Sequence, residues 1–218
     1  MTEVSNKLTM PKETPEEIEF ELRAHIGSVW AGGRLFIGIY TFIFASLAFA
    51  YFYLRSSNNG ELWRPHNVTA PTAFGWTIYS LMLLSAFMAG YGQRRLRKGE
   101  VTDWQVAGWV GVASGMLALF LQLWEFHALT FFPGSSGYAS TFIGFAVVNV
   151  ATIGVCTYWL ETTLARGLRL TKELNGESPA TSKNPSARSF RANVASMTYF
   201  FGFIALASTM FLLMFYVL

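Results

Sequence analysis

Apolar residues along this chain gather in five long stretches that contain no lysine, arginine, aspartate or glutamate. These stretches cover residues 35–54, 73–93, 104–124, 138–160 and 192–218. A helix rises about 1.5 Å per residue, so roughly 20 apolar residues cross a hydrocarbon layer about 30 Å thick. The pattern therefore predicts an all-α integral membrane bundle of five transmembrane helices, with spans over 34–55, 73–93, 104–128, 138–164 and 191–218.

The composition supports this class. Apolar residues make up 52% of the chain and aromatic residues 17%, while 13% are charged. Soluble domains carry about 25% charged residues. A soluble bundle of 218 residues would need a polar shell that this charge fraction cannot supply. We therefore expect residues 34–218 to form one transmembrane domain.

The basic residues predict the orientation. Fourteen of the sixteen lysines and arginines lie before the first span or in the second and fourth connections, and only Arg55 and Arg64 lie in the first connection. Basic residues concentrate on the cytoplasmic side of membrane proteins, so we expect a cytoplasmic N-terminus and a C-terminus outside. The charges follow the loops and form no stripe, which argues against nucleic acid as a partner.

Two segments outside the spans have distinct patterns. Thr14, Pro15 and Glu17 form a typical helix start, and apolar residues then recur near the helical period. Residues 1–33 are therefore expected to be a cytoplasmic segment with a short amphipathic helix on the membrane surface or on a partner subunit. Residues 175–189 are rich in Ser, Pro, Asn and Thr, which favours a mobile cytoplasmic linker.

Gln122 and Glu125 are the candidate site. They lie three residues apart on one helical face, near the outer end of the third span. An acid at membrane depth is costly, at about 2.5 to 3.5 kcal/mol on insertion scales, and usually faces protein or water. Two interpretations stay open. The pair forms a lipid, proton or inter-subunit hydrogen-bonding site, or Glu125 reaches the outer interface beside His127.

Small residues recur every four positions in the third span, at Ala107, Gly111 and Gly115. Such a ridge lets another helix backbone approach closely. We expect it to serve helix packing, within the chain or against another subunit.

Residues for catalysis or metal binding are sparse. The three histidines, His25, His66 and His127, all lie outside the apolar stretches, so a haem pair or a three-histidine copper site cannot be built at membrane depth. The single cysteine, Cys156, excludes an internal disulfide or a thiolate cluster. We therefore expect no catalytic residue, no metal and no cofactor in this chain.

Three stretches of sequence stand out within this layout of helices. They are residues 49–55 (FAYFYLR) with Trp63-Arg64-Pro65 after them, residues 119–126 (LFLQLWEF), and residues 137–145 (GYASTFIGF). Together they resemble subunit III of the haem-copper terminal oxidases, in its compact five-helix bacterial form. The resemblance carries Gln122 and Glu125 over as a structural and lipid or proton-path site.

The sequence also departs from that family. Ile39 and Tyr40 stand where the family usually has a Ser-Glu pair, and Ala146 and Asn149 stand where it has two histidines. These changes leave a helix-packing role intact. They place a direct role in proton handling in question.

The resemblance implies an accessory, cofactor-free subunit in the bacterial plasma membrane. Its partners would be the catalytic subunit I, which carries the haem and copper, the other oxidase subunits, and membrane phospholipids. It would stabilise the catalytic subunit and support proton uptake during oxygen reduction, with cytochrome c or a quinol as electron donor. Two alternatives remain: an accessory subunit of a nitric oxide reductase, and a small transporter or channel that uses Glu125.

Overall fold

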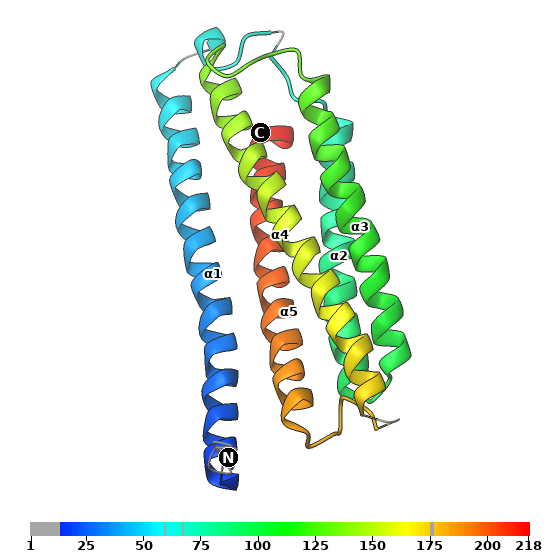
Figure 1. Ribbon diagram of the computed structural model, residues 1–218. Helices are drawn as coiled ribbons and strands as arrows, with labels where there is room; N and C mark the ends of the chain where they lie inside the picture. Colours follow the sequence, from blue (N-terminus) through cyan, green and yellow to red (C-terminus); the bar gives the residue numbers. More distant parts are fainter. Residues whose placement is uncertain (1–13, 59, 67, 175–176) are drawn as a thin grey trace, which may run out of the picture.

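The computed structural model describes residues 14–58, 60–66, 68–174 and 177–218, and these residues are almost entirely helical (Figure 1). Five helices in this part of the chain are long and apolar enough to cross a membrane, and it contains no strand. The predicted all-α five-helix membrane fold is confirmed. The elements are α1 (Pro15–Ser57), the 3-10 helix η1 (Gly60–Leu62), α2 (Thr72–Arg97), α3 (Val101–Ala128), α4 (Gly137–Glu173), α5 (Pro185–Leu212) and the π-helical turn η2 (Leu213–Val217).

Helix α1 begins where the sequence predicts. The Thr14 side chain accepts a hydrogen bond from the Glu17 backbone N–H at 3.3 Å, and the Glu17 carboxylate accepts one from the Thr14 backbone N–H at 2.7 Å. The helix expected to be short is long, because α1 continues without a break to Ser57. Glycines in residues 24–34 cost about 1 kcal/mol each in helix propensity, but this segment has no proline to end the helix. The first 13 residues lie outside the described part.

The other helices extend beyond the expected spans at one end of the bundle. Helix α2 continues to Arg97, α4 continues to Glu173 and α5 already begins at Pro185. We call the end that holds the start of α1, the α2–α3 turn and the α4–α5 loop the basic end. The charges that limited the predicted spans do not end the helices, since arginine, lysine and glutamate are good helix formers.

The expected mobile linker at 175–189 is shorter and better packed than its composition suggests. Residues 185–189 form the first turn of α5, and the Asn184 side chain caps it by accepting from the Ser186 N–H at 2.9 Å. Arg191 donates to the backbone carbonyls of Pro179 at 2.7 Å and Ser182 at 2.9 Å. One arginine therefore holds the loop against α5. Residues 175 and 176 lie outside the described part.

The ridge of small residues on α3 packs within the chain. A Cβ atom added to Gly111 would lie 2.9 Å from Leu160 Cδ2 of α4, and one added to Gly115 would overlap the Thr157 hydroxyl group of the same helix. Ala107 is buried and lies close to Gly92 of α2. Helix α3 is therefore packed tightly between α2 and α4.

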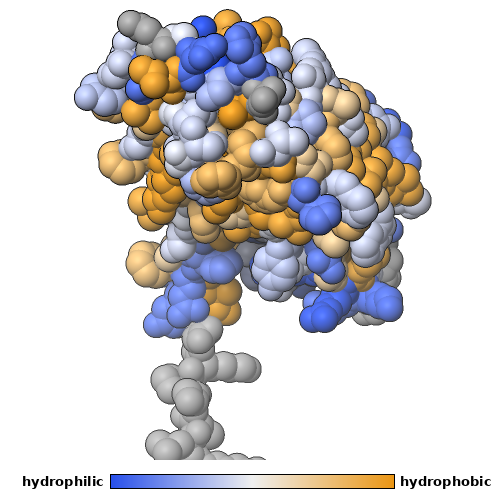
Figure 2. Space-filling view, turned by 90° about the horizontal axis from the view of Figure 1, so that it is seen from above, coloured by the Kyte–Doolittle hydropathy of each residue, from blue (hydrophilic) through white to orange (hydrophobic). Residues whose placement is uncertain are grey.

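Helix α1 lies at the edge of the bundle, beside α5 and α4 (Figure 1). In its most apolar window only 6% of the residues are buried, against 50% in α4 and in α5 with its π-helical turn. Gly33 gives α5 close access, and the Ser196 hydroxyl donates to the Val29 carbonyl at 3.3 Å. Most of the apolar surface of α1 is therefore left for lipid or for another protein. Figure 2 shows hydrophobic residues over much of the surface visible from above.

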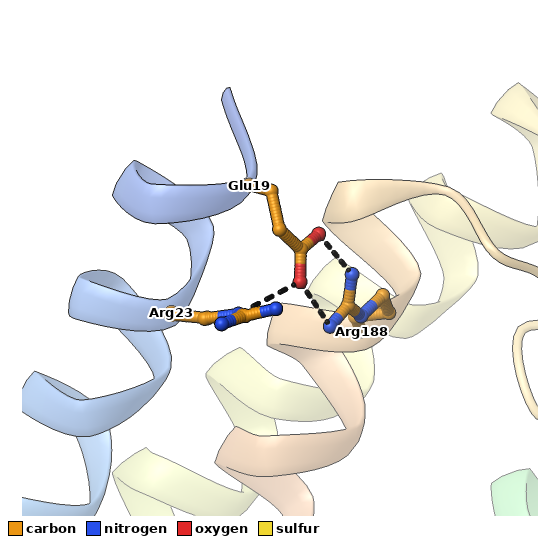
Figure 3. A network of polar contacts seen from close by, with 3 residues as sticks. All are labelled: Glu19, Arg23 and Arg188. Atoms are coloured by element: carbon orange, nitrogen blue, oxygen red, sulfur yellow. Dashed lines mark hydrogen bonds and ion pairs between the residues drawn. The ribbon is translucent and has the colours of Figure 1, made fainter. Parts of the chain in front are cut away.

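An ion pair joins α1 to α5 at the basic end (Figure 3). Arg188 donates to both carboxylate oxygens of Glu19, at 2.7 and 3.1 Å, and Arg23 Nε donates to the same carboxylate at 3.1 Å. The hydrogen bonds from Arg188, and then those from Arg23, lower the pKa of Glu19 to about 2. The contact therefore fixes the edge helix to the bundle core outside the apolar stretch.

Candidate functional site

Gln122 and Glu125 both point into the bundle, and each is 0% exposed. Helix α3 turns Phe120, Leu123 and Trp124 outward on its other faces, where each is about half exposed. A spacing of three residues keeps the amide and the carboxyl group on the inward face. The two predicted site residues therefore come together at the centre of the helix packing.

Four side chains form a continuous hydrogen-bonded chain there. Asn149 of α4 donates its amide N–H to Gln122 Oε1 at 2.7 Å. Gln122 Nε2 donates to one oxygen of the Glu125 carboxyl group, and the Tyr216 hydroxyl donates to the other at 2.7 Å. The order along the chain is Asn149, Gln122, Glu125 and Tyr216. We call these four residues the Glu125 network, which links α4, α3 and η2.

The interpretation in which Glu125 reaches the outer interface is wrong. His127 is exposed, while Glu125 is fully buried. Two residues correspond to about 200° around a helix, so the two side chains leave α3 on different faces. Glu125 also forms none of the ion pairs found in the described part of the chain. Its carboxyl group is accommodated by neutral hydrogen-bond donors from the chain itself.

The π-helical turn brings Tyr216 to the network. Backbone carbonyls of this turn are satisfied by two further tyrosines: Tyr51 donates to Met214 at 2.7 Å, and Tyr138 donates to Phe215 at 2.9 Å. The Tyr216 ring occupies the space beside Gly75 of α2, where an added Cβ would lie 2.5 Å from Tyr216 Cδ1. The glycine therefore makes room for the ring that completes the network.

The site residues that the sequence analysis missed are Asn149, Tyr216 and Gly75. Asn149 carried a signal, because an amide in the middle of an apolar stretch needs a hydrogen-bond partner. Tyr216 gave none, since an aromatic residue near the end of a span is typical of an interfacial belt. The direction of the Tyr216 side chain depends on η2, and no sequence pattern predicted that turn.

The network offers buried hydrogen bonding but no set of metal ligands. In the described part of the chain, no three His, Cys, Asp or Glu side chains lie together. His66 pairs at the surface with Glu61 at 3.3 Å, away from the buried groups. Cys156 is 1% exposed and belongs to the apolar core of the bundle. The chemistry available in the described residues is that of a buried acid held by amides and a phenol.

No protein-family model matches the chain, and no curated protein matches it.

Proposed function

We propose that this chain is an accessory, cofactor-free subunit of a membrane-bound respiratory haem-copper oxidase, in the role of subunit III. The observation that carries the proposal is the Glu125 network. The acid of the resembling motif is fully buried, and residues of the same chain provide its hydrogen bonds. Its arrangement is that of a structural element that joins three helices.

The outer surface is consistent with a subunit of a larger membrane complex. Helix α1 is attached to the bundle along one side, and large apolar side chains remain exposed on it, among them Leu35, Phe42 and Phe49. We propose that the catalytic subunit, which would carry the haem and copper, and phospholipids cover such faces. The chain would stabilise the catalytic subunit and support proton uptake during oxygen reduction, with its N-terminus in the bacterial cytoplasm.

The same network disfavours a transporter built around Glu125. A transported ion or proton needs an acid that lines a passage or a roomy binding site. The cavity nearest to the network has a volume of about 10 Å³, and Glu125 is not one of its lining residues. The carboxyl oxygens are already occupied by Gln122 and Tyr216. This arrangement favours a structural role over transport.

Co-purification tests the proposal. The chain would carry a tag at its N-terminus and be extracted from its native membranes in mild detergent. The reduced-minus-oxidised visible spectrum and the oxygen consumption of the preparation would then be recorded. We expect haem absorbance, with oxygen consumption driven by cytochrome c or by a quinol.

Two other outcomes would contradict the proposal. A colourless, stable preparation of the chain alone, from membranes that contain oxidase activity, would favour the transporter. Haem absorbance with consumption of nitric oxide and not of oxygen would identify the partner as a nitric oxide reductase. An untagged strain processed in parallel controls for haem proteins that bind the resin.

A further inference from the structure

A small cavity lies beside the Glu125 network, between α2, α3, α4, α5 and η2. Its volume is about 10 Å³. One water molecule needs roughly 10 to 15 Å³ of this kind of space. The residues that line it are Gly75, Ile78, Tyr79, Met82, Gln122, Asn149, Ser208, Phe211, Leu212 and Tyr216. The cavity is therefore the size of a single water, and half of its lining residues are polar.

Three of these polar groups have unused hydrogen-bonding capacity. Ser208 is 8% exposed, and its hydroxyl forms none of the hydrogen bonds found between described residues. Asn149 uses one amide N–H to reach Gln122, which leaves its oxygen and its second N–H. The Tyr216 hydroxyl donates to Glu125 and can still accept. All three line one water-sized space, so one molecule can contact them together.

We propose that this cavity is a binding site for one internal water, held by Ser208, Asn149 and Tyr216. The water accepts from the Ser208 hydroxyl and donates to the Asn149 amide oxygen and to the Tyr216 oxygen. A buried water typically makes about three hydrogen bonds to otherwise unsatisfied groups, and these residues provide that number. The water extends the Glu125 network to α5, and the proposal is independent of any partner subunit.

The lining excludes other occupants. A purely apolar cavity would remain dry, but here Ser208 and Asn149 would lose hydrogen bonds without a partner. No charged side chain lines the space, so it lacks the groups that would hold an ion. Its volume of about 10 Å³ matches a single water molecule.

Solid-state NMR on the full chain in bilayers provides the test. Magnetisation would be transferred from water to the side-chain amide of Asn149, with Asn193 as an internal reference. Asn193 is held by Thr163 and Trp159 and does not line the cavity. We expect a water cross-peak at the Asn149 amide although this side chain is buried, and the partly exposed Asn193 serves as the positive reference.

Two variants of Ser208 identify the source of this cross-peak. Ser208→Val fills the space and removes the hydroxyl, so the Asn149 cross-peak should be lost. Ser208→Ala keeps the space with fewer partners, so the cross-peak should weaken. Thr198→Val is the control: the Thr198 hydroxyl also lies on α5, bonds the Val194 carbonyl at 2.9 Å and does not line the cavity. It should leave the cross-peak unchanged.

Two results would overturn the proposal. One is a wild-type Asn149 amide that receives no magnetisation from water. The other is a cross-peak that persists in Ser208→Val while the backbone chemical shifts of the helices match those of the wild type. The chemical shifts distinguish loss of the water from loss of the fold. If the valine variant does not fold, the cross-peak of Ser208→Ala tests the proposal.

Discussion

Glu125 keeps two hydrogen bonds at membrane depth and no cationic neighbour among the described residues. The carboxyl group loses its hydration on burial, and the Gln122 amide and the Tyr216 hydroxyl replace part of it. Each of these donors is itself buried or half-buried, so each needs an acceptor in turn. Each residue of the network therefore needs its neighbours as hydrogen-bond partners, and removal of one residue leaves the adjacent groups without a partner.

This dependence predicts a difference between two substitutions of Glu125. Glu125→Leu removes both acceptor oxygens and should lower the free energy of unfolding by about 1–3 kcal/mol for each donor left unpaired. Glu125→Gln should cost less, because the new amide oxygen can accept from Gln122 while its N–H donates to the Tyr216 oxygen. Reversible unfolding in mixed micelles measures both. Equal losses for the two variants would show that the hydrogen bonds contribute little.

Gly75 predicts a second effect at the scale of one residue. Gly75→Ala places a Cβ about where the Tyr216 ring lies, 2.5 Å from Cδ1. The ring must move, and overpacking of this kind costs about 1–3 kcal/mol. The unfolding free energy should fall accordingly, and a Tyr216→Phe background should recover none of the loss, because the clash involves the ring and not the hydroxyl.

Gly90→Ala is the matched control on the same helix. Its added Cβ would meet only Thr198 Cγ2, at the ordinary contact distance of 4.0 Å. Alanine also favours a helix over glycine by about 1 kcal/mol. We expect unchanged or higher stability for this variant. A loss of stability as large as that of Gly75→Ala would show that the effect does not come from the contact with the Tyr216 ring.

The sequence identified Gln122 and Glu125 because amide and acid side chains are rare in apolar spans. It could not identify their partners. Asn149 lies 27 residues from Gln122 and Tyr216 lies 91 residues from Glu125, so these contacts depend on how α3, α4 and η2 pack. The direction of Glu125 was left open for the same reason, because both interpretations fit the spacing.

At the scale of single helices, the pattern of charges located the apolar part of each helix but not its ends. Helix α1 shows this most clearly, since it runs through Arg34 as one helix of 43 residues. A break was expected there because charge was taken as a boundary. The helix extends past the apolar stretch because residues 16–33 contain no proline, and the Glu19–Arg188 pair, which leaves no local sequence signature, joins this extension to α5.

The Glu19–Arg188 pair predicts that the docking of α1 depends on pH. Pairing lowers the pKa of Glu19 from its ordinary value of 4.5 to about 2. The carboxylate therefore contributes its full stabilisation above the ordinary value, and loses it as pH falls from about 4.5 toward 2. Spin labels on α1 and α5, read by pulsed electron resonance, should report separation at the basic end over this range.

Arg188→Gln is the comparison for this pH effect. Without the guanidinium the Glu19 pKa should return toward its ordinary range, and the separation should be present already at neutral pH. High salt should act in the same direction in the wild type, since the pair is partly exposed to solvent. Distances that do not change between pH 5 and pH 2.5 would show that apolar packing alone holds α1.

For the whole molecule, the number of spans followed from the sequence, whereas the arrangement of the helices did not. Five apolar stretches must become five helices in a bilayer, because each backbone polar group needs an internal partner there. Which helix lies at the edge depends on the fit of particular surfaces. The glycines of α3 face α4 closely, α4 and α5 are the most buried helices, and α1 remains at the periphery.

The placement of charge at the two ends of the bundle gives the last prediction. Arg55 and Arg64 are the only lysines or arginines in the first connection, and the third has none, whereas the other fourteen of the sixteen lie before the first span or in the second and fourth connections. If the basic end faces the cytoplasm, a cysteine at His66 should react with a membrane-impermeant maleimide in intact cells. A cysteine at Lys98 should react only after the membrane is opened.

Both tests are made in a Cys156→Ala background. Cys156 is buried, so the native thiol should be almost unreactive, and the background alone serves as the blank. His66 and Lys98 are exposed and lie in connections at opposite ends of the bundle, so access to each thiol is set by the membrane and not by the fold. The reverse labelling pattern would invert the molecule in the bilayer. It would also place the Glu19–Arg188 pair outside the cell, which contradicts the expected cytoplasmic N-terminus.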